Sequence, residues 1–128
     1  MTGLNKVMLI GTVGRDPEMR YTPDGVAVTS FSLAVKRVWK GSNGKPQESW
    51  DWFSIIAWRH LAEICKQYLA KGEHVYVEGR LQTREWRDEA GQDQLRTEVV
   101  ASHILLLDRK PLPGDAAELS GGEDPSFV

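Results

Sequence analysis

The chain has 128 residues and a formal net charge of −2, and it is long enough to bury the core of one domain. Its single cysteine excludes an internal disulfide, and its three histidines lack zinc-ligand spacing. No unbroken apolar run, 104–107 included, exceeds four residues, which is too short to span a membrane, and the N-terminal residues match neither a secretion signal nor a transit peptide.

The negative charge is concentrated at the C-terminal end. Residues 1–110 hold all 16 lysines and arginines against 14 acids, whereas residues 111–128 hold four acids and no base. The first segment is therefore weakly basic. Because 111–128 is rich in proline and glycine and poor in apolar residues, we expect a disordered acidic tail after a folded domain at 1–110.

Alternating apolar residues predict three strands in the first half of the chain, at 5–14, 26–39 and 48–58. Turn residues predict a connector at 15–25 and a hairpin loop at 40–47. In the second strand, Phe31, Leu33 and Val35 share a face. In the third strand, the face that we expect to point into the core carries Phe53, Ile55 and Ala57.

The hydrophobic period changes in the second half. Apolar residues recur at helical spacing from Leu61 to Leu69, and Gly72 follows as a stop signal, which predicts a helix of about three turns with Cys65 buried on it. Two more strands are predicted at 74–86 and 95–108, the first with Val75, Val77 and Leu81 facing the core. Three strands, one helix and two strands match the OB-fold, an all-β, five-stranded Greek-key barrel.

Five tryptophans in a chain of this length are more than a core of this size usually holds. Trp50, Trp52 and Trp58 share the face of the third strand opposite to its core face, and Trp86 shares a face with Arg84. Aromatic rings beside guanidinium groups suit unpaired nucleobases and their phosphates, and one stacked base contributes roughly 1–3 kcal/mol whatever its identity. An OB-fold binds ligands on its second and third strands and the adjoining loops, where Trp39, Trp52 and Trp58 are expected.

Residues 3–108 also carry a series of motifs in a characteristic order and spacing. They are Asn5-Lys6-Val7, Gly11, Asp16-Pro17-Glu18, Arg20-Tyr21, Gly25, Phe31, Leu33-Ala34, Leu61-Ala62-Glu63, Tyr68-Leu69, Lys71-Gly72, Glu78-Gly79, Thr83, Trp86, Gly91-Gln92-Asp93 and Thr97-Glu98-Val99. In these motifs the chain resembles the bacterial single-stranded DNA-binding proteins. The resemblance implies a bacterial, cytoplasmic and nucleoid-associated homotetramer of OB-folds that binds and protects single-stranded DNA in replication, recombination and repair.

The resemblance also implies which residues contact the DNA. The stacking aromatics of the family fall on Trp39, Trp52, Trp58 and Trp86, and its basic contacts fall on Arg20, Lys40, Lys71 and Arg84. Position and face alone add five further candidates: Trp50, Lys6, Arg37, Arg59 and Arg80. Trp50 is either an extra stacking ring or a residue of a subunit interface. Tetramer formation is also expected because Phe53 and Ile55 are apolar residues that one small barrel would leave uncovered.

The end of the chain departs from the family pattern. Long-tailed relatives end in a run of aspartates followed by Ile-Pro-Phe, whereas this chain ends with a short acidic stretch capped by Val128. The residues of a partner-docking tip would be Asp124, Pro125 and Phe127. We expect the −4 tail to compete with DNA phosphates more than it recruits partner proteins.

Two other classes of function remain open at this point. One is a protein-interaction OB module, such as a primosome component, although five tryptophans are more than it needs. The other is an enzyme, such as a nuclease, which requires carboxylates with a metal or an acid–base pair. The best carboxylates for that purpose, Asp88, Glu89 and Asp93, lie in a predicted polar loop. We therefore expect no catalysis, no cofactor and no metal.

Overall fold

The computed structural model describes residues 3–107 and the backbone of 118–120. Within that part, the elements are β1 (Val7–Val13), β2 (Glu18–Tyr21), β3 (Ala27–Lys40), β4 (Pro46–Trp58), α1 (Arg59–Tyr68), β5 (His74–Arg87), β6 (Asp93–Leu106) and β7 (Glu118–Ser120).

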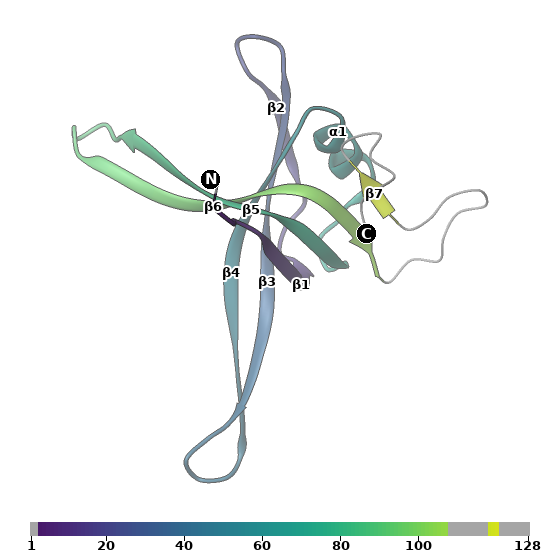
Figure 1. Cartoon of the computed structure of the whole chain (residues 1–128), viewed down its shortest axis with the longest axis vertical. Helices are drawn as coiled ribbons and strands as arrows, with labels where there is room; N and C mark the ends of the chain where they lie inside the picture. The colour runs from purple at the N-terminus through teal and green to yellow at the C-terminus, as the bar shows by residue number, and fades with distance from the viewer. Residues whose placement is uncertain (1–2, 108–117, 121–128) are drawn as a thin grey trace.

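Five of the strands close into a barrel (Figure 1). They pair in the order β1-β5-β6-β4-β3, and β1 returns to β3 through Thr12 opposite Ala34 and Val13 opposite Leu33. The β4–β6 contact is parallel and the others in this ring are antiparallel. The predicted OB-fold, with its helix between the third and fourth barrel strands, is confirmed.

The core lies inside this barrel and under α1. The predicted core faces are confirmed at Phe31, Leu33, Ile55 and Ala57, and α1 adds Leu61, Ala62 and Cys65. Burial raises the pKa of the Cys65 thiol to about 12, so this cysteine is a buried apolar residue, as expected. The prediction for Leu81 was wrong: it is 43% exposed, because β5 extends past the core after Gly79, where the β5–β6 register shifts.

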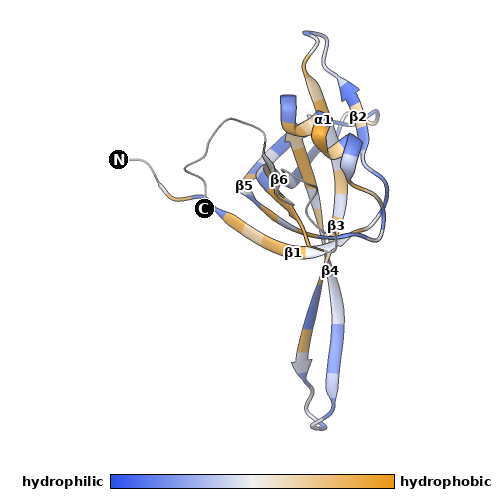
Figure 2. Ribbon diagram, turned by 90° about the vertical axis from the view of Figure 1, so that its right-hand side faces the viewer, coloured by the Kyte–Doolittle hydropathy of each residue, from blue (hydrophilic) through white to orange (hydrophobic). Residues whose placement is uncertain are grey.

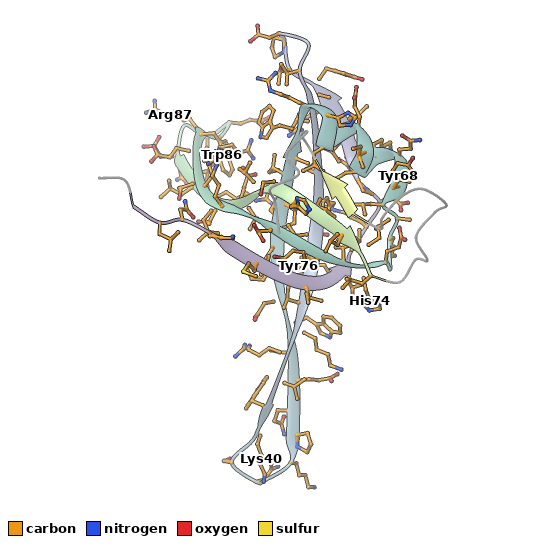
Figure 3. All side chains as sticks on the ribbon, turned by 45° about the vertical axis from the view of Figure 1, so that its right-hand side comes forward. Lys40, Tyr68, His74, Tyr76, Trp86 and Arg87 are labelled. Carbon is orange, nitrogen blue, oxygen red and sulfur yellow. The ribbon has the colours of Figure 1, made fainter. Side chains whose placement is uncertain are left out.

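The β3–β4 and β5–β6 hairpins extend beyond the barrel (Figure 1). We call residues 35–51 of β3, β4 and their turn the β3–β4 arm, and its tip carries Lys40 (Figure 3). The other hairpin is formed by the outer halves of β5 and β6 and carries Trp86 and Arg87 near its end (Figure 3). Figure 2 shows that hydrophobic colour follows the barrel strands, whereas the β3–β4 arm is largely hydrophilic. The β3–β4 arm therefore has no core of its own.

One local expectation needs correction. The predicted connector 15–25 contains the short strand β2, which pairs with β3 from Glu18–Ser30 to Tyr21–Ala27. The predicted helix is confirmed as α1, which ends at Tyr68, and Gly72 after it adopts the left-handed value φ 92°. Of the expected tail, Glu118–Ser120 pair with β6 as β7, and the rest, including Asp124, Pro125 and Phe127, lies outside the described residues.

A buried carboxylate lies on the outer side of β5. The Tyr76 hydroxyl donates a 2.6 Å hydrogen bond to Oε1 of Glu78, and Nζ of Lys6 lies 3.1 Å from Oε2. The hydrogen bond from Tyr76, followed by Lys6 and His103, holds the pKa of Glu78 below its ordinary value although burial acts in the opposite direction. Burial, followed by the same hydrogen bond and the charge of Glu78, raises the pKa of Tyr76 to about 12. The Glu78 carboxylate therefore stabilises the fold in its ionised form.

Replacing Tyr76 by phenylalanine is expected to lower the free energy of unfolding by about 1.5–3 kcal/mol at pH 7, the contribution of a hydrogen bond to a charged group. A lowered carboxyl pKa contributes stability above its ordinary value of 4.5 that is lost as the pH falls through the folded-state pKa. Urea unfolding at several pH values should thus show a difference from the parent protein that shrinks in acid. Tyr68→Phe is the matched control, and an equal loss there, or a loss independent of pH, would contradict the assignment.

Candidate functional site

A groove of about 330 Å³ lies on the outer face of β3 and β4, beside the β5–β6 hairpin. Its walls come from six parts of the chain, and the residues are Arg15, Arg20, Ser30, Phe31, Ser32, Trp52, Phe53, Ser54, Ile56, Arg84, Arg96 and Glu98. The groove thus combines an exposed aromatic ring, three serine hydroxyls and four guanidinium groups.

The register of β3 and β4 defines the face on which this groove lies. Directly opposite residues of an antiparallel pair share a face, so Lys36–Trp50, Ala34–Trp52, Ser32–Ser54, Ser30–Ile56 and Val28–Trp58 all lie on one side, which we call the front face. Trp50, Trp52 and Trp58 are 46%, 63% and 39% exposed. They span roughly 26 Å of one strand at the usual rise per residue. The front face therefore presents a row of three accessible rings that passes through the groove.

Gly14 positions the central ring of this row. A Cβ atom at Gly14 would lie 2.5 Å from Cζ3 of Trp52 and 2.8 Å from Oγ of Ser32. The Trp52 ring therefore rests directly on the backbone at Gly14, where only glycine leaves the space.

Replacing Gly14 by alanine is expected to displace the Trp52 ring and to remove part of the roughly 1–3 kcal/mol that one stacked base contributes. Fluorescence titration with oligo(dT) measures this loss, and thermal unfolding by circular dichroism shows whether the fold is kept. Gly3→Ala is the control, because a Cβ atom there meets nothing within 4 Å. Unchanged affinity in a folded Gly14→Ala protein would show that the position of this ring is unimportant.

Most of the positive charge in the groove is unpaired. Nη2 of Arg84 lies 3.5 Å from Oε2 of Glu98, whose side chain is 5% exposed. Arg15, Arg20 and Arg96 form no ion pair with the residues that the structure describes. Three guanidinium groups are therefore available to an anionic ligand, and the fourth is shared with a buried carboxylate.

The remaining predicted aromatics lie outside the groove. Trp86 is on the β5–β6 hairpin, where the guanidinium of Arg84 lies 5.0 Å from its ring centroid (Figure 3). Trp39 is not on the front face: it is paired with Gln47, on the side of β3 that carries Leu33 and Phe53 inside the barrel. The face of Trp39 was predictable from the sequence, because Trp39 has the same odd parity as Phe31 and Leu33.

The structure brings only some of the predicted basic residues together. Arg20 and Arg84 line the groove, whereas Arg37 lies beside Trp39 and Lys40 lies at the arm tip (Figure 3). The backbone N–H of Lys71 donates to Oδ1 of Asp16, and its side chain does not line the groove.

Three further candidates lie at other places on the surface. Lys6 is paired with Glu78, and it lines a separate cavity of about 380 Å³ together with Arg80. Arg59 begins α1 with the left-handed value φ 59°, and it lines a third cavity with Tyr21 and His60. None of the three contributes to the walls of the groove.

Sequence reasoning missed two of the groove arginines. Arg96 lies directly opposite Arg84 in the β5–β6 register, so it shares the face of Arg84 and Trp86. The sequence did offer an indication, because Arg96 and Glu98 alternate as polar residues on one face of a predicted strand. Arg15 lies in the β1–β2 connection, where no periodicity indicates a direction, so nothing local could have found it.

In residues 3–107, no group of three or more histidine, cysteine or acidic side chains is arranged to hold a metal ion. No helix in the same part of the chain has the length and apolar character needed to cross a membrane.

Comparisons with known proteins give consistent results. The model of the "Single-strand binding protein family" matches residues 4–107. A curated relative, "Single-stranded DNA-binding protein 1" of Chlorobaculum tepidum, is 46% identical over 127 residues, which cover 98% of this chain and 78% of the relative. Among solved structures, the Plasmodium falciparum SSB in complex with ssDNA is similar with a TM-score of 0.78 and 34% identity, covering 84% of this chain and 98% of that one.

Proposed function

The chain belongs to the single-strand binding protein family, and on that premise we propose that the front face and its groove bind single-stranded DNA. The observation that carries this assignment is the convergence of Trp52 with three unpaired arginines in one groove. The solved relative, an SSB in complex with ssDNA, supports the choice of ligand.

The geometry supports separate roles for the aromatic rings, which stack on bases, and for the arginines, which contact phosphates. Bases stack on the exposed rings of Trp52 and Trp58, because every base offers an aromatic face and the contact does not depend on sequence. Phosphates lie against Arg15, Arg20 and Arg96, where each contact releases counterions and makes the affinity depend on salt. The binding is therefore tolerant of sequence, as coating and protecting exposed strands in replication, recombination and repair requires.

We also propose that the protein acts by binding and not by catalysis. Among the described residues that line the groove, only Glu98 is acidic, and it is paired with Arg84. The groove therefore offers no second carboxylate for acid–base chemistry. Given a bacterial relative that binds DNA, the proposed location is the bacterial cytoplasm, at the nucleoid.

The proposed assembly is a homotetramer with closed symmetry. The expectation that Phe53 and Ile55 would need a subunit interface to cover them is wrong, because Ile55 is fully buried and Phe53 packs against the core. Met8 and Ile10 of β1 support the proposal instead, since they are 63% and 60% exposed beside Tyr76 and Glu78. Residues 1–110 would form the binding and assembly domain and 111–128 an acidic appendage. Sedimentation that shows only monomer at micromolar concentration would contradict the tetramer.

A competition experiment tests the proposed ligand. A labelled oligo(dT) should be displaced by single-stranded homopolymers and poorly by duplex DNA of equal length, because paired bases cannot stack on the rings. A protein-interaction module would bind neither polymer, and a nuclease would shorten the labelled strand in the presence of magnesium. Either of these results would overturn the proposal.

A further inference from the structure

The β3–β4 arm has two usable faces, although the proposed DNA path uses only the front one. Within the described residues, its central part, 36–50, pairs only with itself, so the arm is a single two-stranded layer (Figure 1). Opposite residues share a face, and the back face carries the pairs Val35–Asp51, Arg37–Ser49 and Trp39–Gln47.

The back face holds an organised aromatic and cationic site. The guanidinium of Arg37 lies 5.1 Å from the ring centroid of Trp39, which is 43% exposed. Nε of Arg37 lies 3.3 Å from Oδ2 of Asp51, and Nη2 donates a 3.2 Å hydrogen bond to Oγ of Ser49. A guanidinium has five N–H donors, so this network fixes its position and leaves donors for a phosphate.

The front face holds a second site of the same kind. Trp50 is directly opposite Lys36 and is 46% exposed. Nζ of Lys36 lies 3.0 Å from Oε2 of Glu48, and both side chains are about half exposed. An exposed pair of this type is weak, so the lysine can exchange its partner for a phosphate.

The two faces of the arm continue into different parts of the barrel. On the front, Trp50 continues directly to Trp52 and into the groove. On the back face, the residues that follow Trp39 toward the barrel are Val35 and then Leu33 and Phe53. Leu33 belongs to the barrel core, and Phe53 packs against it. A strand stacked on Trp39 therefore cannot continue along the same face toward the groove.

We propose that the arm binds single-stranded DNA on both faces, and that the stretch on Trp39 is separate from the stretch that runs over Trp50 into the groove. The arm would then lie between two passages of one long strand. This inference rests on the proposed function, and it assigns Trp50 to DNA binding rather than to a subunit interface.

Oligonucleotide length separates the two passages. The test uses the full chain with an oligo(dT) of about 8 nucleotides, within the range that one OB-fold binds, and with poly(dT). Trp50→Ala should weaken binding of both ligands by roughly 5- to 150-fold, the range for one stacked base. Trp39→Ala should leave the affinity for the short oligonucleotide unchanged, weaken binding of poly(dT) and shorten the length of strand that each protein occludes.

Three controls make each outcome decisive. Val38→Ala removes an exposed apolar side chain of the arm without a ring and should change neither affinity. Trp39→Phe keeps a ring and should retain most of the poly(dT) affinity. Trp52→Ala must weaken the binding of both ligands, because it tests the groove itself. Wild-type affinity of this variant would overturn the proposed function and this inference together.

The inference alone fails in three cases while Trp52→Ala still weakens binding. In the first, Trp39→Ala weakens the binding of the short oligonucleotide as much as the binding of poly(dT), which means that one passage of the strand touches both faces. In the second, Trp39→Ala or Trp50→Ala leaves both affinities unchanged. In the third, Trp39→Ala dissociates the assembly in sedimentation, which makes the back face a contact between copies of the chain.

Discussion

Replacing Trp52 by alanine is expected to weaken the binding of oligo(dT) by about 1–3 kcal/mol, without preference for any base. Trp52 is the most exposed of the five rings at 63%, and it is the one tryptophan among the residues that line the groove. Its ring lies against Gly14 and is not part of the core cluster, so its removal should leave the fold intact.

The measurement is a titration at fixed salt with oligonucleotides of different base composition. Trp52→Phe is the matched variant, since it keeps a smaller ring on the same strand position and should recover part of the loss. Sedimentation and circular dichroism should be unchanged in both proteins. If folded Trp52→Ala binds as tightly as the parent protein, the groove is not the stacking site.

Removing the three unpaired groove arginines together should have the largest electrostatic effect. Each phosphate contact on a single strand contributes about 0.7 to the slope of log K against log salt, so the Arg15→Ala, Arg20→Ala, Arg96→Ala protein should lose about 2 from that slope. At 0.1 M salt this corresponds to binding weaker by roughly 100-fold. Arg84 is left in place because its removal would leave the buried Glu98 carboxylate without its partner.

A second triple variant separates local contacts from net charge. Arg59, Arg80 and Arg87 lie outside the groove, and their replacement by alanine removes the same formal charge. Its salt slope should stay close to that of the parent protein, because screening reduces distant charges to a small effect. Equal slopes for the two triple variants would mean that the arginines of the groove are not phosphate contacts.

The sequence predicted the part of the site that follows from alternation along one strand. Trp50, Trp52 and Trp58 have the same parity. Because β4 is regular from end to end, the row of rings was predictable from the sequence alone. The core faces followed from the same rule. The rule failed for Leu81, because parity gives the face of a strand but does not show where the core beneath it ends.

The parts that could not be predicted depend on contacts between distant segments. The groove joins Arg15, Arg20 and Arg96, which come from a connection and from two strands, β2 and β6, that are separated by β3 and β4 in the sheet. The strand β2 has four residues without clear alternation, and its pairing with β3 defines it. The position of Trp39 was predictable from its odd parity, but its role on the back of the arm required the register and the contacts of Arg37.

The most direct test of the central claim is the intrinsic tryptophan fluorescence of the unmodified protein during titration with poly(dT). All five tryptophans are at least 39% exposed, and three of them form the row on the front face. Stacking of bases on these rings should quench the emission strongly and saturate at a fixed number of nucleotides per chain, and added salt should reverse it. Emission that stays constant throughout the titration would contradict the account, because a strand bound at this site cannot leave the rings unchanged.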